Sequence, residues 1–100
     1  MKAVLGQTVL AEAPVEDLVK IEGNCYFPPS SLTDGAFEKS PTAYHCPWKG
    51  DAQYWNVGAG DDRLPDGAWS YPEPIPSSFD RVGQDYSGYV AFDPRVTVAE

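Results

Sequence analysis

The amino-acid sequence predicts a mainly β fold, a compact single domain over residues 1–100 with an antiparallel sheet and one or two short helical turns. Three observations predict it. Apolar residues recur in short alternating runs, the pattern of half-buried strands. Ten prolines and nine glycines exceed the average combined share of about 12% and indicate many turns. No apolar-periodic stretch has the length of a long helix.

The N-terminal quarter of the chain predicts two hairpins. Residues 2–10 hold two β-prone runs around Gly6-Gln7, where the glycine supplies the positive φ of a two-residue turn. Residues 18–27 alternate apolar and polar side chains, break at Gly23-Asn24 and then resume. We therefore expect a second hairpin that turns at Gly23-Asn24.

The middle of the chain predicts a short helical turn and then two aromatic-rich β segments. Residues 28–39 carry proline, serine and an Asp-Gly pair, which favour one short helical turn. Residues 42–57 form two aromatic-rich β segments separated by a turn at 47–50. Residues 58–67 are polar and glycine-rich, so we expect a loop there, followed by a β run over 68–71.

The C-terminal quarter predicts a short helix and two strands. Residues 72–76 contain three prolines, which lack the donor N–H of a central strand. Residues 77–82 begin with two serines and favour a short capped helix. Residues 88–92 are a strong strand candidate, and 96–98 form the final strand.

Charge and cysteine content narrow the classes of function. Seven basic and fifteen acidic residues give a net charge of −8, so we expect neither nucleic acid nor an anionic membrane surface as a partner. No run reaches the roughly 18 apolar residues of a membrane span, and no leader pattern is present. We expect a soluble cytoplasmic protein in which Cys25 and Cys46 are free thiols.

Four motifs occur in a fixed order along the chain: YFP at Tyr26–Pro28, HCPWKGDAQYW at His45–Trp55, AWSYPEP at Ala68–Pro74 and GYVAF at Gly88–Phe92. In this order they resemble a bacterial family known as domain of unknown function 427, which carries a nucleotidyltransferase-like name. The resemblance spans nearly the whole chain. It implies a β-tent-like sheet, the architecture of methionine-R-sulfoxide reductases and yippee-like zinc proteins, and it implies no particular activity.

Zinc-bearing β-tents use two Cys-x-x-Cys pairs, and this chain has neither. The two cysteines, His45 and a carboxylate could in principle coordinate one metal ion. Adjacent His45 and Cys46 would point to opposite faces of a strand, however, which disfavours such a site. The acids Asp61-Asp62 lie in a predicted loop, and Lys49-Gly50 lacks the glycine spacing of a P-loop, so nucleotidyl transfer is disfavoured. We expect no metal and no cofactor.

Cys46 and His45 are the candidate catalytic residues, and the sequence leaves catalysis open. Lys49 lies three residues from Cys46 and could stabilise its thiolate, whereas the favoured alternative is a small buried side chain. His45 is a candidate base, and a structural hydrogen-bonded imidazole is again favoured.

The candidate ligand-binding residues are Lys49, Trp48, Tyr54 and Trp69. Lys49 is the one positive charge between Lys39 and Arg63, and we expect it to be exposed, beside an aromatic pocket. The sequence thus predicts a domain that binds a small anionic or aromatic molecule around the turn from Cys46 to Lys49. The alternative is a non-catalytic protein-interaction or structural module.

Overall fold

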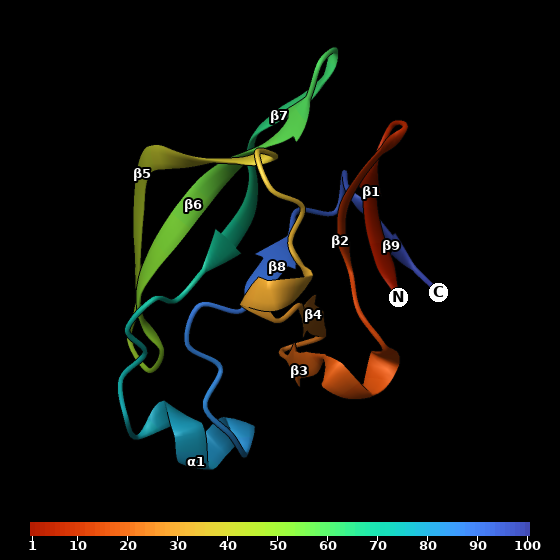
Figure 1. Ribbon diagram of the computed structural model, residues 1–100. Helices are drawn as coiled ribbons and strands as arrows, with labels where there is room; N and C mark the ends of the chain where they lie inside the picture. The colour runs from red at the N-terminus through yellow and green to blue at the C-terminus, as the bar shows by residue number, and fades with distance from the viewer.

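A computed structural model of residues 1–100 contains nine strands, one α-helix and two single-turn 3-10 helices (Figure 1). In chain order the elements are β1 (Lys2–Leu5), β2 (Thr8–Glu12), η1 (Val15–Asp17), β3 (Val19–Ile21), β4 (Asn24–Tyr26), η2 (Pro29–Ser31), β5 (Phe37–Cys46), β6 (Gly50–Ala59), β7 (Asp62–Ser70), α1 (Ser78–Val82), β8 (Val90–Phe92) and β9 (Thr97–Ala99). The predicted mainly β fold is confirmed. Three short helical segments occur where the sequence predicted one or two.

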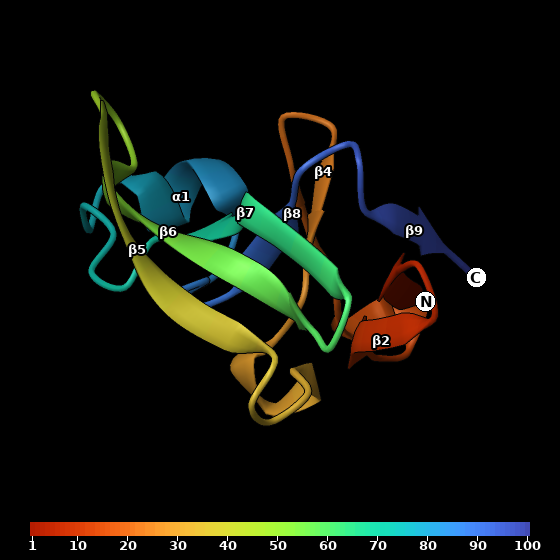
Figure 2. The same cartoon turned by 90° about the horizontal axis from the view of Figure 1, so that it is seen from above.

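The strands form three antiparallel sheets, ordered β2-β1-β9, β3-β4 and β5-β6-β7-β8. The four-stranded sheet is the largest layer, and β2, β1 and β9 lie to one side of it (Figure 2). Lys2 pairs with Ala99, so the two ends of the chain lie close together. No helix in the protein combines the length and apolar character needed to cross a lipid bilayer.

Each face of the four-stranded sheet buries its own apolar cluster. In β8, Val90 and Phe92 belong to the first cluster and Ala91 to the second, because successive strand residues point to opposite faces. The first cluster joins the sheet to β1 and β2 through Ala3 and Leu10. The second cluster, which carries the candidate site, joins the sheet to β3, β4 and α1.

The predicted loop over 58–67 is wrong, because this segment is a hairpin formed by the end of β6 and the start of β7. Gly58 has a φ of 122°, and a Cβ there would come within 1.8 Å of the backbone oxygen of Asp62. The pairing of β6 with β7 also shifts in register between Trp55 and Val57. Glycine and proline mark bulged strands as well as loops, and here they mark a bulged strand.

The turn between β3 and β4 lies at Glu22-Gly23, one residue earlier than predicted. Ile21 pairs with Asn24, which leaves two residues in the turn. Both have positive φ, 53° for Glu22 and 83° for Gly23, as a type I′ hairpin turn requires. Glu22 therefore lies at the tip of the hairpin, in a backbone conformation that residues other than glycine rarely adopt.

Candidate functional site

The turn between β5 and β6 carries the candidate site. Cys46 and Gly50 pair across it, and Gly50 has a φ of 110°, which is the freedom that glycine provides. The backbone N–H of Ile75 donates to the carbonyl of Lys49 at 2.9 Å. The proline-rich segment after β7 therefore packs against this turn and holds it in one position.

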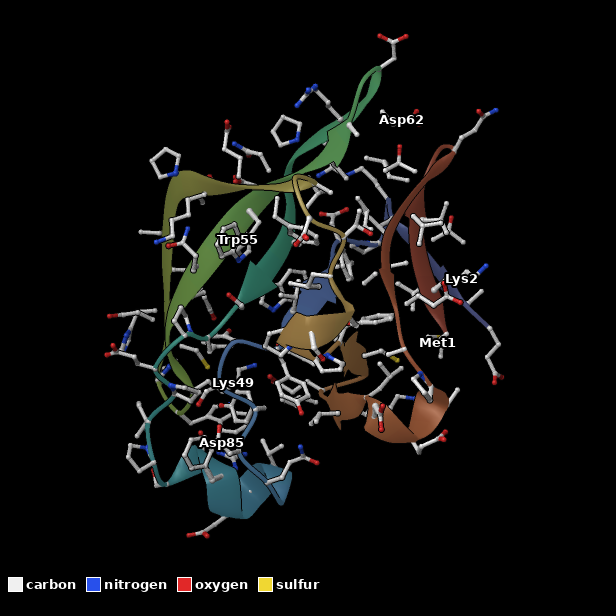
Figure 3. All side chains as sticks on the ribbon, viewed as in Figure 1. Met1, Lys2, Lys49, Trp55, Asp62 and Asp85 are labelled. Carbon is white, nitrogen blue, oxygen red and sulfur yellow. The ribbon has the colours of Figure 1, made fainter.

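Lys49 is buried, and the prediction that it is exposed is wrong. Its side chain is 8% exposed, and its ammonium forms an ion pair with Glu22, whose side chain is 57% exposed. The Nζ atom lies 5.1 Å from the ring centroids of Trp48 and Tyr71, close enough for cation–π attraction to both. Figure 3 shows Lys49 between the four-stranded sheet and α1.

The ammonium of Lys49 remains charged at neutral pH. Burial alone would lower its pKa, but the hydrogen bond to Glu22, together with Coulombic interactions with Tyr26, Glu22 and Cys46, raises the pKa above its ordinary value. A lysine acts as a nucleophile when its pKa is depressed. Lys49 is therefore equipped to bind an anion and not to attack a carbonyl carbon.

Neutral phenols surround this cation. Burial raises the pKa of Tyr26, Tyr71 and Tyr86. The indole N–H of Trp69 donates to the Tyr26 hydroxyl at 3.0 Å, and the Tyr86 hydroxyl donates to the Oγ of Ser78 at 2.9 Å. Tyr26 and Tyr86 thus stay protonated and held in place, and Glu22 supplies the negative charge that faces Lys49.

The structure brings together most of the residues selected from the sequence. Cys46 belongs to the second cluster, and Trp48 and Trp69 pack against it. Tyr54 packs on Trp69, with ring centroids 6.3 Å apart and the rings tilted by 45°. The four candidate ligand-binding residues therefore lie around the second cluster, on one face of the sheet.

His45 does not join this group. It points to the opposite face from Cys46, and its Nδ1 lies 2.7 Å from a carboxylate oxygen of Asp51 in an exposed pair. Cys46 is 5% exposed and forms no disulfide. The two candidate catalytic side chains are therefore not arranged as a thiol and its base.

Two residues of this neighbourhood were missed by sequence reasoning: Glu22 and Arg81. The guanidinium carbon of Arg81, on α1, lies 4.1 Å from the ring centroid of Trp48. Glu22 reaches Lys49 from the tip of the β3–β4 hairpin. No spacing in the sequence links these residues to the turn, because the contacts depend on how hairpin and helix pack on the sheet.

Surface hollows lie elsewhere. One of about 440 Å³ is lined by Ala43, Tyr44, His45, Asp51 and Ala52, and one of about 410 Å³ lies at the other end of the sheet, against Phe37, Val57 and Leu64. Neither hollow includes Lys49 or Trp48. The space in front of the ammonium is instead occupied by the Glu22 carboxylate.

The acidic residues do not gather into a metal centre, since no group of three or more His, Cys, Asp or Glu side chains lies close enough to hold an ion. Asp62 instead accepts hydrogen bonds from the backbone N–H of Gln7 and the hydroxyl of Thr8, both at 3.1 Å. This aspartate joins the tips of two hairpins, as Figure 3 shows near its upper edge.

Comparison with known proteins places the chain in a family. No curated protein sequence matches it. The sequence model named NTP_transf_9, with the description "Domain of unknown function (DUF427)", matches residues 2–100. Because this match covers nearly the whole chain, the protein belongs to the DUF427 family.

Proposed function

We propose that this protein binds a small aromatic anion at Lys49, and that the Glu22 carboxylate occupies the anion position in the free protein. The observation that carries the proposal is the state of the Lys49 ammonium: it is buried, charged and next to two aromatic rings. Its hydrogen bond to Glu22 uses one of three donor protons. A buried ammonium needs an anionic partner, and a ligand can provide one.

Glu22 is suited to give way to such a ligand. It lies in the tight turn at the tip of a hairpin whose strands have three residues each. Its side chain is more than half exposed, so it regains water when displaced. Its positive φ stores strain that a movement of the turn can release.

The aromatic part of the proposed ligand follows from the residues around the ammonium. Trp48 and Tyr71 contact it, and the tilted pair of Tyr54 and Trp69 lies on the same face of the sheet. Tyr44, on this face of β5, is 51% exposed. Offset or edge contacts between aromatic rings contribute about 0.5–1.5 kcal/mol beyond burial, so a ring attached to the anion adds affinity.

Isothermal titration calorimetry with benzoate tests the proposal. We expect benzoate to bind the wild type, to bind Glu22→Gln more tightly because the internal competitor is gone, and not to bind Lys49→Met. Lys39→Met, which removes an exposed lysine of β5, is the matched control and should bind as the wild type does. The proposal fails if benzoate binds none of these proteins, or binds Lys49→Met as well as the wild type.

The proposed role is binding within one cytoplasmic domain, where Cys25 and Cys46 remain thiols. The alternative, an interaction module without a ligand, has weaker support. The large apolar side chains that are exposed, Val9, Val15 and Tyr44, come from three different elements. Large contiguous apolar patches are what mark a protein-binding surface.

A further inference from the structure

The indole of Trp48 contacts two cations. The guanidinium carbon of Arg81 lies 4.1 Å from the ring centroid, and the ammonium of Lys49 lies 5.1 Å from it. Arg81 comes from α1 and Lys49 from the turn between β5 and β6, so the contact depends on the packing of helix against sheet. Trp48 therefore places two positive charges in one neighbourhood of a protein whose net charge is −8.

Arg81 has no acidic partner. The ion pairs of the protein involve Lys2, His45, Lys49 and Arg95, and Arg81 is not among them. Arg81 is exposed, so its donors are open to a ligand. A guanidinium over an aromatic ring keeps these donors available, and their forked geometry matches the oxygens of carboxylate or phosphate.

Helix α1 fixes the position of this guanidinium. Gly83 ends the helix with a φ of 97°, and its N–H donates to the carbonyl of Phe79 at 2.7 Å. Phe79 and Val82 pack against the second cluster and anchor the helix there. Arg81 lies between these two anchors in the sequence and projects to the surface beside Trp48.

We infer that Arg81 is the second anion contact of the proposed site and that the ligand is an aryl phosphomonoester. This inference rests on the proposed function. When Glu22 moves away, Lys49 joins Arg81 as a positive charge without an acidic partner. A monocarboxylate replaces only the charge that Glu22 supplied. A phosphomonoester carries about −1.5 to −2 at neutral pH and offers three acceptor oxygens, so it can neutralise both cations.

Calorimetry with phenyl phosphate, benzoate and inorganic phosphate at neutral pH tests the inference. We expect the wild type to bind phenyl phosphate about tenfold more tightly than benzoate, since charge-assisted hydrogen bonds to an additional cation contribute at least that factor. Arg81→Gln should lose this preference, because its affinity for phenyl phosphate falls about tenfold more than its affinity for benzoate does. Inorganic phosphate should bind more weakly than phenyl phosphate because it lacks the ring.

Arg63→Gln is the matched control, since Arg63 is exposed on β7 and donates to the carbonyl of Gly60, away from Trp48. Circular dichroism establishes that each variant is folded. Equal affinity for phenyl phosphate and benzoate, unchanged in Arg81→Gln, overturns the inference and leaves the proposed function standing if benzoate binding still requires Lys49. Equal affinity for inorganic and phenyl phosphate overturns the aryl part. Failure of every probe to bind the wild type overturns both.

Discussion

The carboxylate of Glu22 pairs with the buried ammonium of Lys49 and thereby ties the β3–β4 hairpin to the four-stranded sheet. The two residues lie in turns that connect strands of different sheets and are separated by 27 positions in the chain. One partner is buried and the other is more than half exposed. Because of this asymmetry, removing the charge of Glu22 and removing that of Lys49 should change the free energy of unfolding by different amounts.

Removing the Glu22 charge should cost more stability than removing Lys49. Glu22→Gln leaves a buried ammonium without its counter-charge, and we expect the free energy of unfolding to fall by about 1–2 kcal/mol, less than for a fully buried pair because Glu22 is partly solvated. Lys49→Met places an apolar chain among the rings and should cost less. Urea denaturation measures both. A larger loss for Lys49→Met than for Glu22→Gln would contradict the prediction.

Stability should fall steeply at alkaline pH. The pKa of Lys49 is raised above 10.5 and that of Tyr71 above 10.0 in the folded protein. The unfolded chain therefore loses these protons first, so the stabilisation is complete below the unfolded pKa values and is lost as pH rises through the folded ones. Tyr71→Phe keeps the ring and removes one titrating group, which should make the loss shallower. Urea midpoints measured from neutral pH to about pH 11 give the slope; an identical slope for both proteins would refute this assignment.

The two cysteines should differ in reactivity. Cys46 is buried in the second cluster, whereas Cys25 is half-buried and packs against the first. A thiol reacts only when a reagent reaches it, so N-ethylmaleimide should modify Cys25 first and Cys46 mainly after unfolding. Mass spectrometry of timed samples, with and without denaturant, measures both rates. Rapid modification of Cys46 in folded Cys25→Ala protein would restore it as a candidate nucleophile.

The hairpin between β6 and β7 should tolerate alanine at one glycine and not at another. Gly58→Ala forces a Cβ to within 1.8 Å of the backbone of Asp62 at a φ of 122°, and we expect a loss of more than about 3 kcal/mol or failure to fold. Gly60, with a φ of 57°, has open space around it, so Gly60→Ala should lose only about 1–2 kcal/mol through backbone strain. Urea unfolding of the two variants compares them directly, and equal losses would show that the close approach at Gly58 is unimportant.

Local patterns in the sequence predicted many of the elements. The turn at Gly6-Gln7 lies between β1 and β2, the helix predicted over 77–82 is α1, and the strand predicted over 88–92 contains β8. Turn residues and alternation act over a few positions, so they can be recognised without knowing the fold. The loop predicted over 58–67 fails for the same reason, since glycine and proline mark a bulge and a loop alike and only the pairing with a neighbouring strand distinguishes them.

The candidate site likewise combines features that the sequence predicted with features that depend on tertiary contacts. The sequence predicted that residues 47–50 form an unusual turn that carries Lys49, because Pro47 fixes its own φ and Gly50 can adopt a positive one. The burial of Lys49 became apparent only in the folded chain, as did its pairing with Glu22 of the β3–β4 hairpin. The contact of Arg81, on α1, with Trp48 is likewise a product of the fold. Burial and charge pairing depend on side chains brought together from distant parts of the chain, and no local pattern records which of them will meet.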